Sequence, residues 1–180
     1  MVNTADHGGE NPDAFLAGAI VDDAVRRRRA ERWGRRAALD DVTVVGTLAA
    51  CVGEEVVTRL ATGQEVRGTV TFVGTEVVQI DAVRSVHWIR ADAILAVTPS
   101  SGRIAALPDT PWAGDQHDRP LASLLADLVD DGRPVEVHLA GVAAITGMVD
   151  AVGASLVLTD SMGHRSVVGL DTVLSVTLAL

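Results

Sequence analysis

The chain of 180 residues contains no lysine and no tyrosine, one cysteine, and only 3% aromatic residues. A single cysteine, Cys51, excludes a disulfide within the chain and a metal site built on several thiolates. It is typical of a reducing compartment, so we expect a cytoplasmic location. With so few aromatic residues, the core must be built from Val, Leu, Ile and Ala, and a hydrophobic fraction of 48% is ample for that.

Long apolar runs are also missing. None reaches the roughly 18 residues that a membrane-spanning helix needs, and the polar, acidic segment 1–13 is unlike a secretory signal. We therefore expect no membrane partner. The formal net charge of −9 argues against a general nucleic-acid binder, whose surface would be basic.

Sequence motifs that carry catalysis are absent as well. The chain has no nucleophile elbow, zinc-protease motif, phosphate-binding loop or dinucleotide fingerprint. The five histidines include no pair at helical spacing and no cysteine neighbour, and we interpret His87 and His138 as outward or partly exposed strand residues. We therefore expect no enzyme, with no catalytic residues, no metal site and no cofactor.

What the chain does contain is an internal repeat. Residues 53–98 (repeat 1) recur without a gap as residues 132–177 (repeat 2), at a constant offset of 79 positions, with 14 of 46 positions identical. Most of the identical residues are apolar or glycine, the types that build a fold. The pattern therefore predicts two copies of one small unit, each near the lower size limit for a self-sufficient core.

Each repeat reads as five short strands. In repeat 1 we expect strands at 56–60, 66–73, 76–80, 85–90 and 93–98, and the clean alternation of 135–139 marks the first strand of repeat 2. Gly68 and Gly147 stand in the middle of the long second strand, which predicts a sharp bend or a bulge there. Asp92 and Asp171 recur at the start of the fifth strand, and we interpret them as turn caps.

Helices and a linker separate these units. Residues 1–12 are interpreted as a disordered tail and 13–39 as an N-terminal helix rich in arginine. Short helices are expected after Asp40-Asp41, where the run of β-branched residues also allows a strand, and from Pro120 to Gly132. The domains are then 41–98 and 120–180, joined by a proline-rich linker over 99–119.

The order of a short helix and five bent strands resembles the Sm-like fold of small β-barrels. Val56, Leu60, Gly63, Gly68 and Val70 match the first Sm block, and residues 89–94 (IRADAI) are similar to the second. The resemblance implies two tandem five-stranded barrels whose open edge strands pair with further barrels. The loop at 74–78 departs from the RNA-binding form, so the implied nucleotide pocket is reduced. The whole layout also resembles a group of uncharacterised actinobacterial proteins.

The arginine-rich helix leaves the function open between alternatives. Its seven arginines lie within eleven residues and can pair with the acidic barrels, contact nucleic acid, or bind a protein partner. The candidate binding residues are Arg26, Arg27, Arg28, Arg29, Arg32, Arg35, Arg36 and, in repeat 1, Arg90. We predict a mainly β fold with α-helices: two tandem Sm-like bent barrels, each preceded by a short helix, plus the N-terminal helix.

The function that this pattern favours is a non-enzymatic Sm-like interaction or assembly module. We expect a homo-oligomer formed through the edge strands, and an unidentified protein partner. The alternative is an RNA- or DNA-binding regulatory protein that uses the arginine-rich helix and an Sm-like surface.

Overall fold

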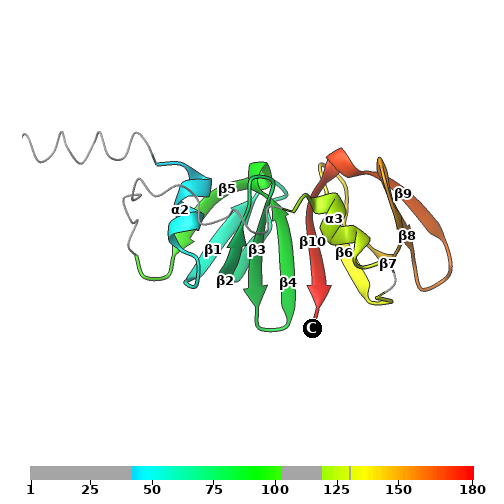
Figure 1. Cartoon of the computed structure of the whole chain (residues 1–180), viewed down its shortest axis with the longest axis horizontal. Coiled ribbons are helices and arrows are strands. Elements are labelled where there is room, and N and C mark those ends of the chain that lie inside the picture. The colour runs from blue at the N-terminus through cyan, green and yellow to red at the C-terminus, as the bar shows by residue number, and fades with distance from the viewer. Residues whose placement is uncertain (1–41, 103–118, 130) are drawn as a thin grey trace, which may run out of the picture. The chain divides into compact units, whose positions relative to one another are not determined.

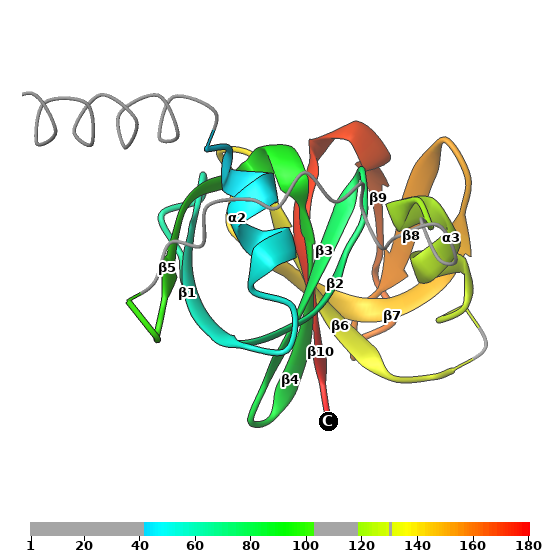
Figure 2. The same ribbon diagram turned by 60° about the vertical axis from the view of Figure 1, so that its left-hand side comes forward.

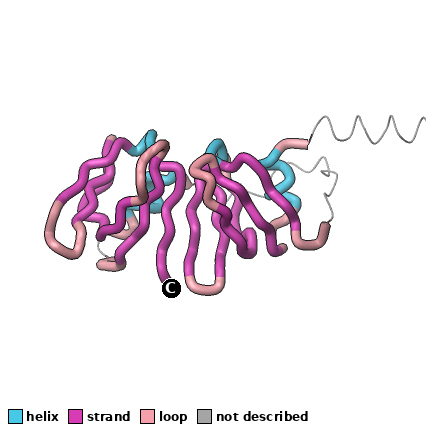
Figure 3. The backbone as a smooth tube through the Cα atoms, turned by 180° about the vertical axis from the view of Figure 1, so that it is seen from behind, coloured by secondary structure: helices cyan, strands magenta, loops and turns pink. Residues whose placement is uncertain are grey.

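Strands dominate the computed structural model, which describes residues 42–102, 119–129 and 131–180. Figure 3 shows strands (magenta) along most of the described backbone, with a few short helical turns. The prediction of a mainly β fold with α-helices is therefore confirmed. The predicted tail (1–12), the N-terminal helix (13–39) and most of the predicted linker lie outside the described residues.

Each repeat contributes five consecutive strands. In repeat 1 they are β1 Glu55–Leu60, β2 Glu65–Val73, β3 Val77–Ala82, β4 Ser85–Arg90 and β5 Ile94–Pro99. In repeat 2 they are β6 Pro134–Leu139, β7 Ile145–Val152, β8 Ser155–Thr159, β9 Arg165–Gly169 and β10 Val173–Ala179. A turn of 3₁₀ helix precedes the last strand of each set, η1 Ala91–Ala93 and η2 Leu170–Thr172. Pro99, predicted to open the linker, closes β5 instead.

The ten strands form one open antiparallel sheet rather than two separately closed barrels. Their order is β5-β1-β2-β3-β4-β10-β6-β7-β8-β9, so β5 and β9 are the outer strands. The two repeats meet where β4 pairs with β10, which lie side by side in Figures 1 and 2. The edge-to-edge pairing that the Sm-like resemblance implies between barrels thus occurs between the two repeats of one chain.

A short helix precedes the strands of each repeat. Helix α2, Val44–Ala50, begins where the Thr43 hydroxyl accepts the Gly46 N–H at 3.0 Å, a cap that decides for helix in this β-branched stretch. Helix α3, Leu121–Ala126, starts after Pro120, as predicted. Each helix buries leucine against its own repeat. Leu48 in α2 and Leu121 and Leu125 in α3 are fully buried, and each such burial contributes about 2 kcal/mol.

The core consists of two clusters, one for each repeat, that share residues across the β4–β10 junction. The first contains Leu48 and the inward residues of β1 to β5, and Leu174 from repeat 2 packs against it. The second contains the leucines of α3 and the inward residues of β6 to β10, and it includes Val77 from repeat 1. Because each cluster takes a residue from the other repeat, apolar burial reinforces the backbone pairing of β4 with β10.

The mid-strand glycines have a different role from the predicted bend. Gly68 pairs regularly with Val56, and the shift in register comes later, between Val70 and Phe72. A Cβ atom at Gly68 would lie 2.5 Å from the Asp81 carbonyl oxygen. The glycine is therefore required for the close approach of β2 to β3, and the bulge is a separate feature of the same strand. In repeat 2 the shift falls at the equivalent place.

Candidate functional site

Most of the predicted binding residues lie outside the described part of the chain. This applies to the arginines of the N-terminal segment: Arg26, Arg27, Arg28, Arg29, Arg32, Arg35 and Arg36. Arg90 is the one member of the predicted set that the structure describes. The candidate site is therefore built around Arg90 and the junction of β4 with β10.

Arg90 ends β4 and holds the two repeats together. Its Nη1 donates to the backbone carbonyl of Asp171, 81 residues away, at 2.8 Å. Its Nε and Nη2 donate to the two carboxylate oxygens of Asp92, at 3.0 and 2.5 Å. The side chain is only 23% exposed. A guanidinium engaged in this way is already occupied by the junction and is a poor candidate for contacting a phosphate.

The repeated aspartates take part in this contact in different ways. Asp92 lies in the first turn of η1 and Asp171 in the first turn of η2, but neither 3₁₀ turn has a side-chain cap at its N-terminus. The interpretation of both residues as turn caps therefore fails. Asp92 supplies its carboxylate to Arg90 and Asp171 its backbone oxygen, so the two positions serve opposite sides of one junction.

A polar cluster lies on one face of β4, β10 and β6. His87 faces Thr177 in the register of β4 with β10, and Thr177 faces Glu136 in that of β10 with β6. The Thr177 hydroxyl lies 3.1 Å from His87 Nδ1, and the Ser85 hydroxyl lies 2.8 Å from His87 Nε2. The imidazole is thus held on both nitrogens.

The prediction that His87 is outward or partly exposed is wrong. The residue is buried, and Thr177 of β10, from the other repeat, lies directly beside it, a neighbour that an isolated repeat 1 would lack. Burial lowers the pKa of His87, the neighbouring His138 lowers the pKa further, and Glu136 acts in the opposite direction. His87 is therefore a neutral, structural imidazole near neutral pH.

His138 is partly exposed, as predicted. Its side chain is 13% exposed, and its Nε2 is buried without a hydrogen-bond partner among the described residues, 3.9 Å from a Glu136 carboxylate oxygen. The sequence reasoning missed this cluster because its members come from three strands of two repeats. The one local hint of a special role for His138 is a difference between the repeats, since repeat 1 has Arg59 at the equivalent place.

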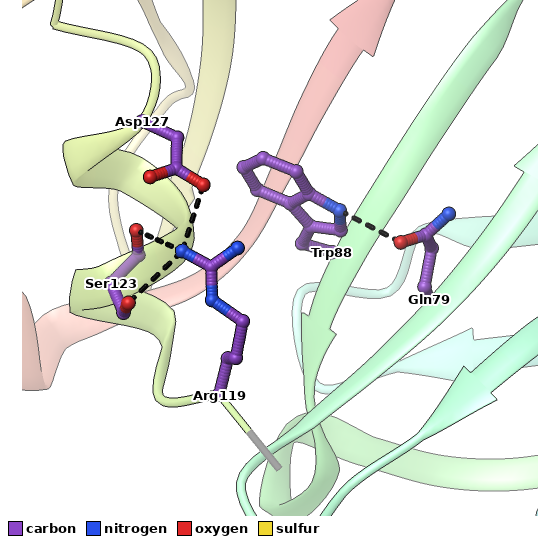
Figure 4. Close-up of polar contacts among 5 residues, drawn as sticks. All are labelled: Gln79, Trp88, Arg119, Ser123 and Asp127. Atoms are coloured by element: carbon purple, nitrogen blue, oxygen red, sulfur yellow. Dashed lines mark hydrogen bonds and ion pairs between the residues drawn. The ribbon is translucent and has the colours of Figure 1, made fainter. Parts of the chain in front are cut away.

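Trp88 occupies the opposite face of β4. Figure 4 shows its indole directed towards α3, with the ring N–H donated to Gln79 Oε1 at 3.2 Å. The ring packs against the core cluster of repeat 2, so Trp88 is a core residue at the junction of the two repeats. Beside it, Arg119 Nη2 donates to Asp127 at 2.7 Å and to the backbone oxygen and hydroxyl of Ser123, each at 3.0 Å. These bonds tie the start of α3 to its end.

Each repeat has a surface hollow at the same place. One, of about 690 Å³, lies beside Gly68, and another, of about 350 Å³, lies beside Gly147. The first is lined by Arg67 and Glu55, which pair with each other at 2.9 Å, whereas the second has Thr146 and Pro134 there. Both hollows contain an aspartate, Asp81 in the first and Asp160 in the second, but the first also has Arg67 and Arg84, and the second is lined by no arginine. The two hollows therefore do not share one set of charges.

Within residues 42–102, 119–129 and 131–180, no group of three or more His, Cys, Asp or Glu side chains could hold a metal ion. In the same ranges, no helix has both the length and the apolar character needed to cross a membrane.

Comparison with known proteins adds no family to this description. No family model matches the chain, and no curated protein matches it either.

Proposed function

We propose that the chain is a non-enzymatic interaction and assembly module of the Sm-like type, in which two small five-stranded units are fused in tandem. The observation that carries the proposal is the edge-to-edge pairing of β4 with β10 inside one chain. Both repeats have the same strand order, and the last strand of one unit meets the fourth strand of the other. A unit that uses its edges to join a copy of itself is built for assembly rather than for chemistry.

The outer edges extend this argument. Among the described residues, β5 and β9 each pair on one side only, and an unpaired edge strand is a template for joining another chain. The proposed module is therefore a homo-oligomer that forms through these outer strands and presents its remaining surface to a protein partner.

Self-assembly is tested by sedimentation velocity on the full chain, from about 1 to 100 µM at physiological salt. We expect a discrete oligomer that dissociates on dilution. A monomer across the whole range would refute self-assembly through the edges.

A second candidate is RNA or DNA binding through the arginine-rich segment, and it rests on the seven arginines between Arg26 and Arg36. Arg90 does not support it, since its guanidinium is bound at the junction. The test is fluorescence anisotropy of labelled single-stranded RNA and duplex DNA at low and physiological salt. Nucleic-acid binding predicts a steep salt dependence and loss of affinity when Arg26–Arg29 become Ala, whereas Arg67→Ala, at an exposed ion pair, leaves it unchanged.

A further inference from the structure

The two outer strands are the counterparts of the two strands that pair inside the chain. With the offset of 79 residues, β9 corresponds to β4 and β5 corresponds to β10. The β4–β10 junction therefore provides a template against which each outer edge can be judged. If both outer edges kept the features of this template, chains would join head to tail, with β9 of one copy on β5 of the next.

The β5 edge has lost a donor that the template uses. Ser100 donates its backbone N–H to the Glu55 carbonyl of β1 at 2.9 Å. Because the direction of the amides alternates along an antiparallel strand, those of Val97 and residue 99 point to the open side. Residue 99 is proline and has no N–H to offer. Proline at such a place is a known protection of an edge strand against pairing.

The same position in β10 is occupied by Leu178. Leu180 donates its backbone N–H to the Arg84 carbonyl at 3.0 Å, so by alternation the amide of Leu178 also faces β4. Leu178 lies opposite Val86 in the register of the junction. In a head-to-tail contact, Arg165 would take the place of Val86 and would face Pro99. Such a contact would therefore lose one backbone hydrogen bond of the template.

The head-to-tail contact would lose side-chain interactions as well. Gly169 stands in β9 where β4 has Arg90, so the bond from the guanidinium to the opposite carbonyl cannot form. Val167 replaces Trp88, whose ring packs against the next repeat. The outer edges have therefore diverged from the template at the residues that make it specific.

The β9 edge, in contrast, retains its backbone groups. Asp160 of the preceding turn donates its N–H to the His164 carbonyl at 3.0 Å, which turns residue 164 towards β8. By alternation, the amides and carbonyls of Arg165, Val167 and Gly169 point to the open side. None of the three is proline, and Val167 is 72% exposed.

These outward groups are arranged symmetrically about Val167. If the β9 strands of two chains run antiparallel, Val167 lies opposite its own copy, and Arg165 lies opposite Gly169 on both sides. All three positions are then hydrogen-bonded pairs, with on the order of six backbone bonds between the chains. No like charges face each other directly, and the glycine leaves room for the arginine side chain, which is held by Asp150 at 3.2 Å.

We propose that the β9 edge, Arg165–Gly169, binds the β9 edge of a second copy of this chain, giving a twofold dimer with the β5 edges at its ends. This proposal rests on the assembly function above and specifies its geometry. It requires a closed dimer, because Pro99 protects β5 from further addition.

The test compares matched substitutions on the two outer edges of the full chain. Val167→Lys places two like charges opposite each other across the twofold axis, and because the residue is exposed the fold is unaffected. Leu95→Lys makes the same change on β5, at a residue that is 63% exposed. We expect a dimer for the unaltered chain, at least a ~10-fold higher dissociation constant for Val167→Lys, and no change for Leu95→Lys, all by sedimentation velocity. Circular dichroism verifies the fold of both variants.

Crosslinking supplies an independent readout. A short bis-maleimide should join two Val167→Cys chains into a covalent dimer, since Cys51 is buried and does not compete. An oligomer larger than a dimer that both lysine substitutions disrupt would mean head-to-tail pairing and would overturn the proposal. An oligomer that neither substitution disrupts would overturn it as well. A monomer at every concentration would instead refute the assembly function itself.

Discussion

Gly68→Ala tests the close approach of β2 to β3. The added Cβ would lie 2.5 Å from the Asp81 carbonyl oxygen, 2.8 Å from the Asp81 carbonyl carbon and 2.8 Å from Ile80 Cγ2. Two of these three atoms belong to the backbone of β3, which is paired on its other side with β4. The strand cannot yield without disturbing two ladders, so the strain of the methyl group is retained in the native state.

The expected cost follows from the size of this overlap. Real Cβ atoms do not approach closer than 3.0 Å, so the strand must shift by about half an ångström or more in a buried region, and overpacking of this kind costs about 1–3 kcal/mol. We expect the upper part of that range for Gly68→Ala. Gly147→Ala should cost about 1 kcal/mol, because its closest atom, the Thr159 carbonyl oxygen, is 2.8 Å away.

Gly153→Ala is the matched control. Nothing lies within 4 Å of the Cβ position at Gly153, and its φ is outside the left-handed region. Replacement by alanine should leave stability unchanged or raise it by about 0.4–1 kcal/mol, through the lower entropy of the unfolded chain.

The assay is urea unfolding followed by circular dichroism. With an m-value of about 2 kcal/mol per molar urea, the loss for Gly68→Ala lowers the midpoint by about 1 M. If Gly68→Ala unfolds at the same urea concentration as Gly153→Ala, the close approach is not what keeps this position as glycine. The ranking Gly68 over Gly147 over Gly153 is the sharper form of the prediction, since it compares three identical substitutions.

Two further predictions concern the junction. Arg90→Gln should lower the free energy of unfolding by about 1–2 kcal/mol, because it removes bonds to Asp92 and to the opposite repeat. Arg67→Gln, at an exposed ion pair, should cost clearly less. Urea unfolding of both variants checks this, and equal losses would contradict it. Burial lowers the pKa of His87, so below about pH 6.5 the unfolded state binds more protons and stability should fall with decreasing pH, by at most about 1.4 kcal/mol per pH unit for one group. The measurement is the urea midpoint from pH 5 to 8. The fall in the midpoint at low pH that is due to His87 should disappear in His87→Gln and remain in His164→Gln, whose side chain is exposed.

Local features of the fold could be predicted from the sequence because their determinants are local. β4 covers the predicted residues without error, since a turn on each side bounds it. The sequence of helix α2 is ambiguous because Val44 and Val45 favour strands. The cap at Thr43 and the burial of Leu48 are what stabilise the helix over a strand. Propensity alone contains neither of these pieces of information.

The junction could be predicted in kind but not in detail. An unpaired edge in each copy indicates that the edges must pair, yet nothing in the sequence shows which strand meets which. The contact of Arg90 with Asp171 spans 81 residues, and the burial of His87 depends on β10 from the other repeat. The same non-local cause explains why Arg90 was assigned to a binding surface, since an arginine near the end of a strand looks free until its partner is known.

The distribution of differences between the repeats explains why the internal pairing prevails over pairing between chains. The β4 segment, 85–90, shares no identical residue with its counterpart, 164–169, whereas β5 and β10 keep a leucine, a valine and a threonine in common. A duplicated unit with two identical copies of β4 would offer every β10-like edge two equal partners, one inside the chain and one outside. Chains would then grow without limit. Arg90 makes the inner partner preferable. Pro99 removes a backbone N–H donor from the free β10-like edge, β5, so that edge pairs less well. The pairing inside the chain is therefore favoured over its copies between chains. β9 has diverged from β4 and no longer competes with it for β10-like edges. β9, rather than β5, is therefore available for a symmetric contact between two chains.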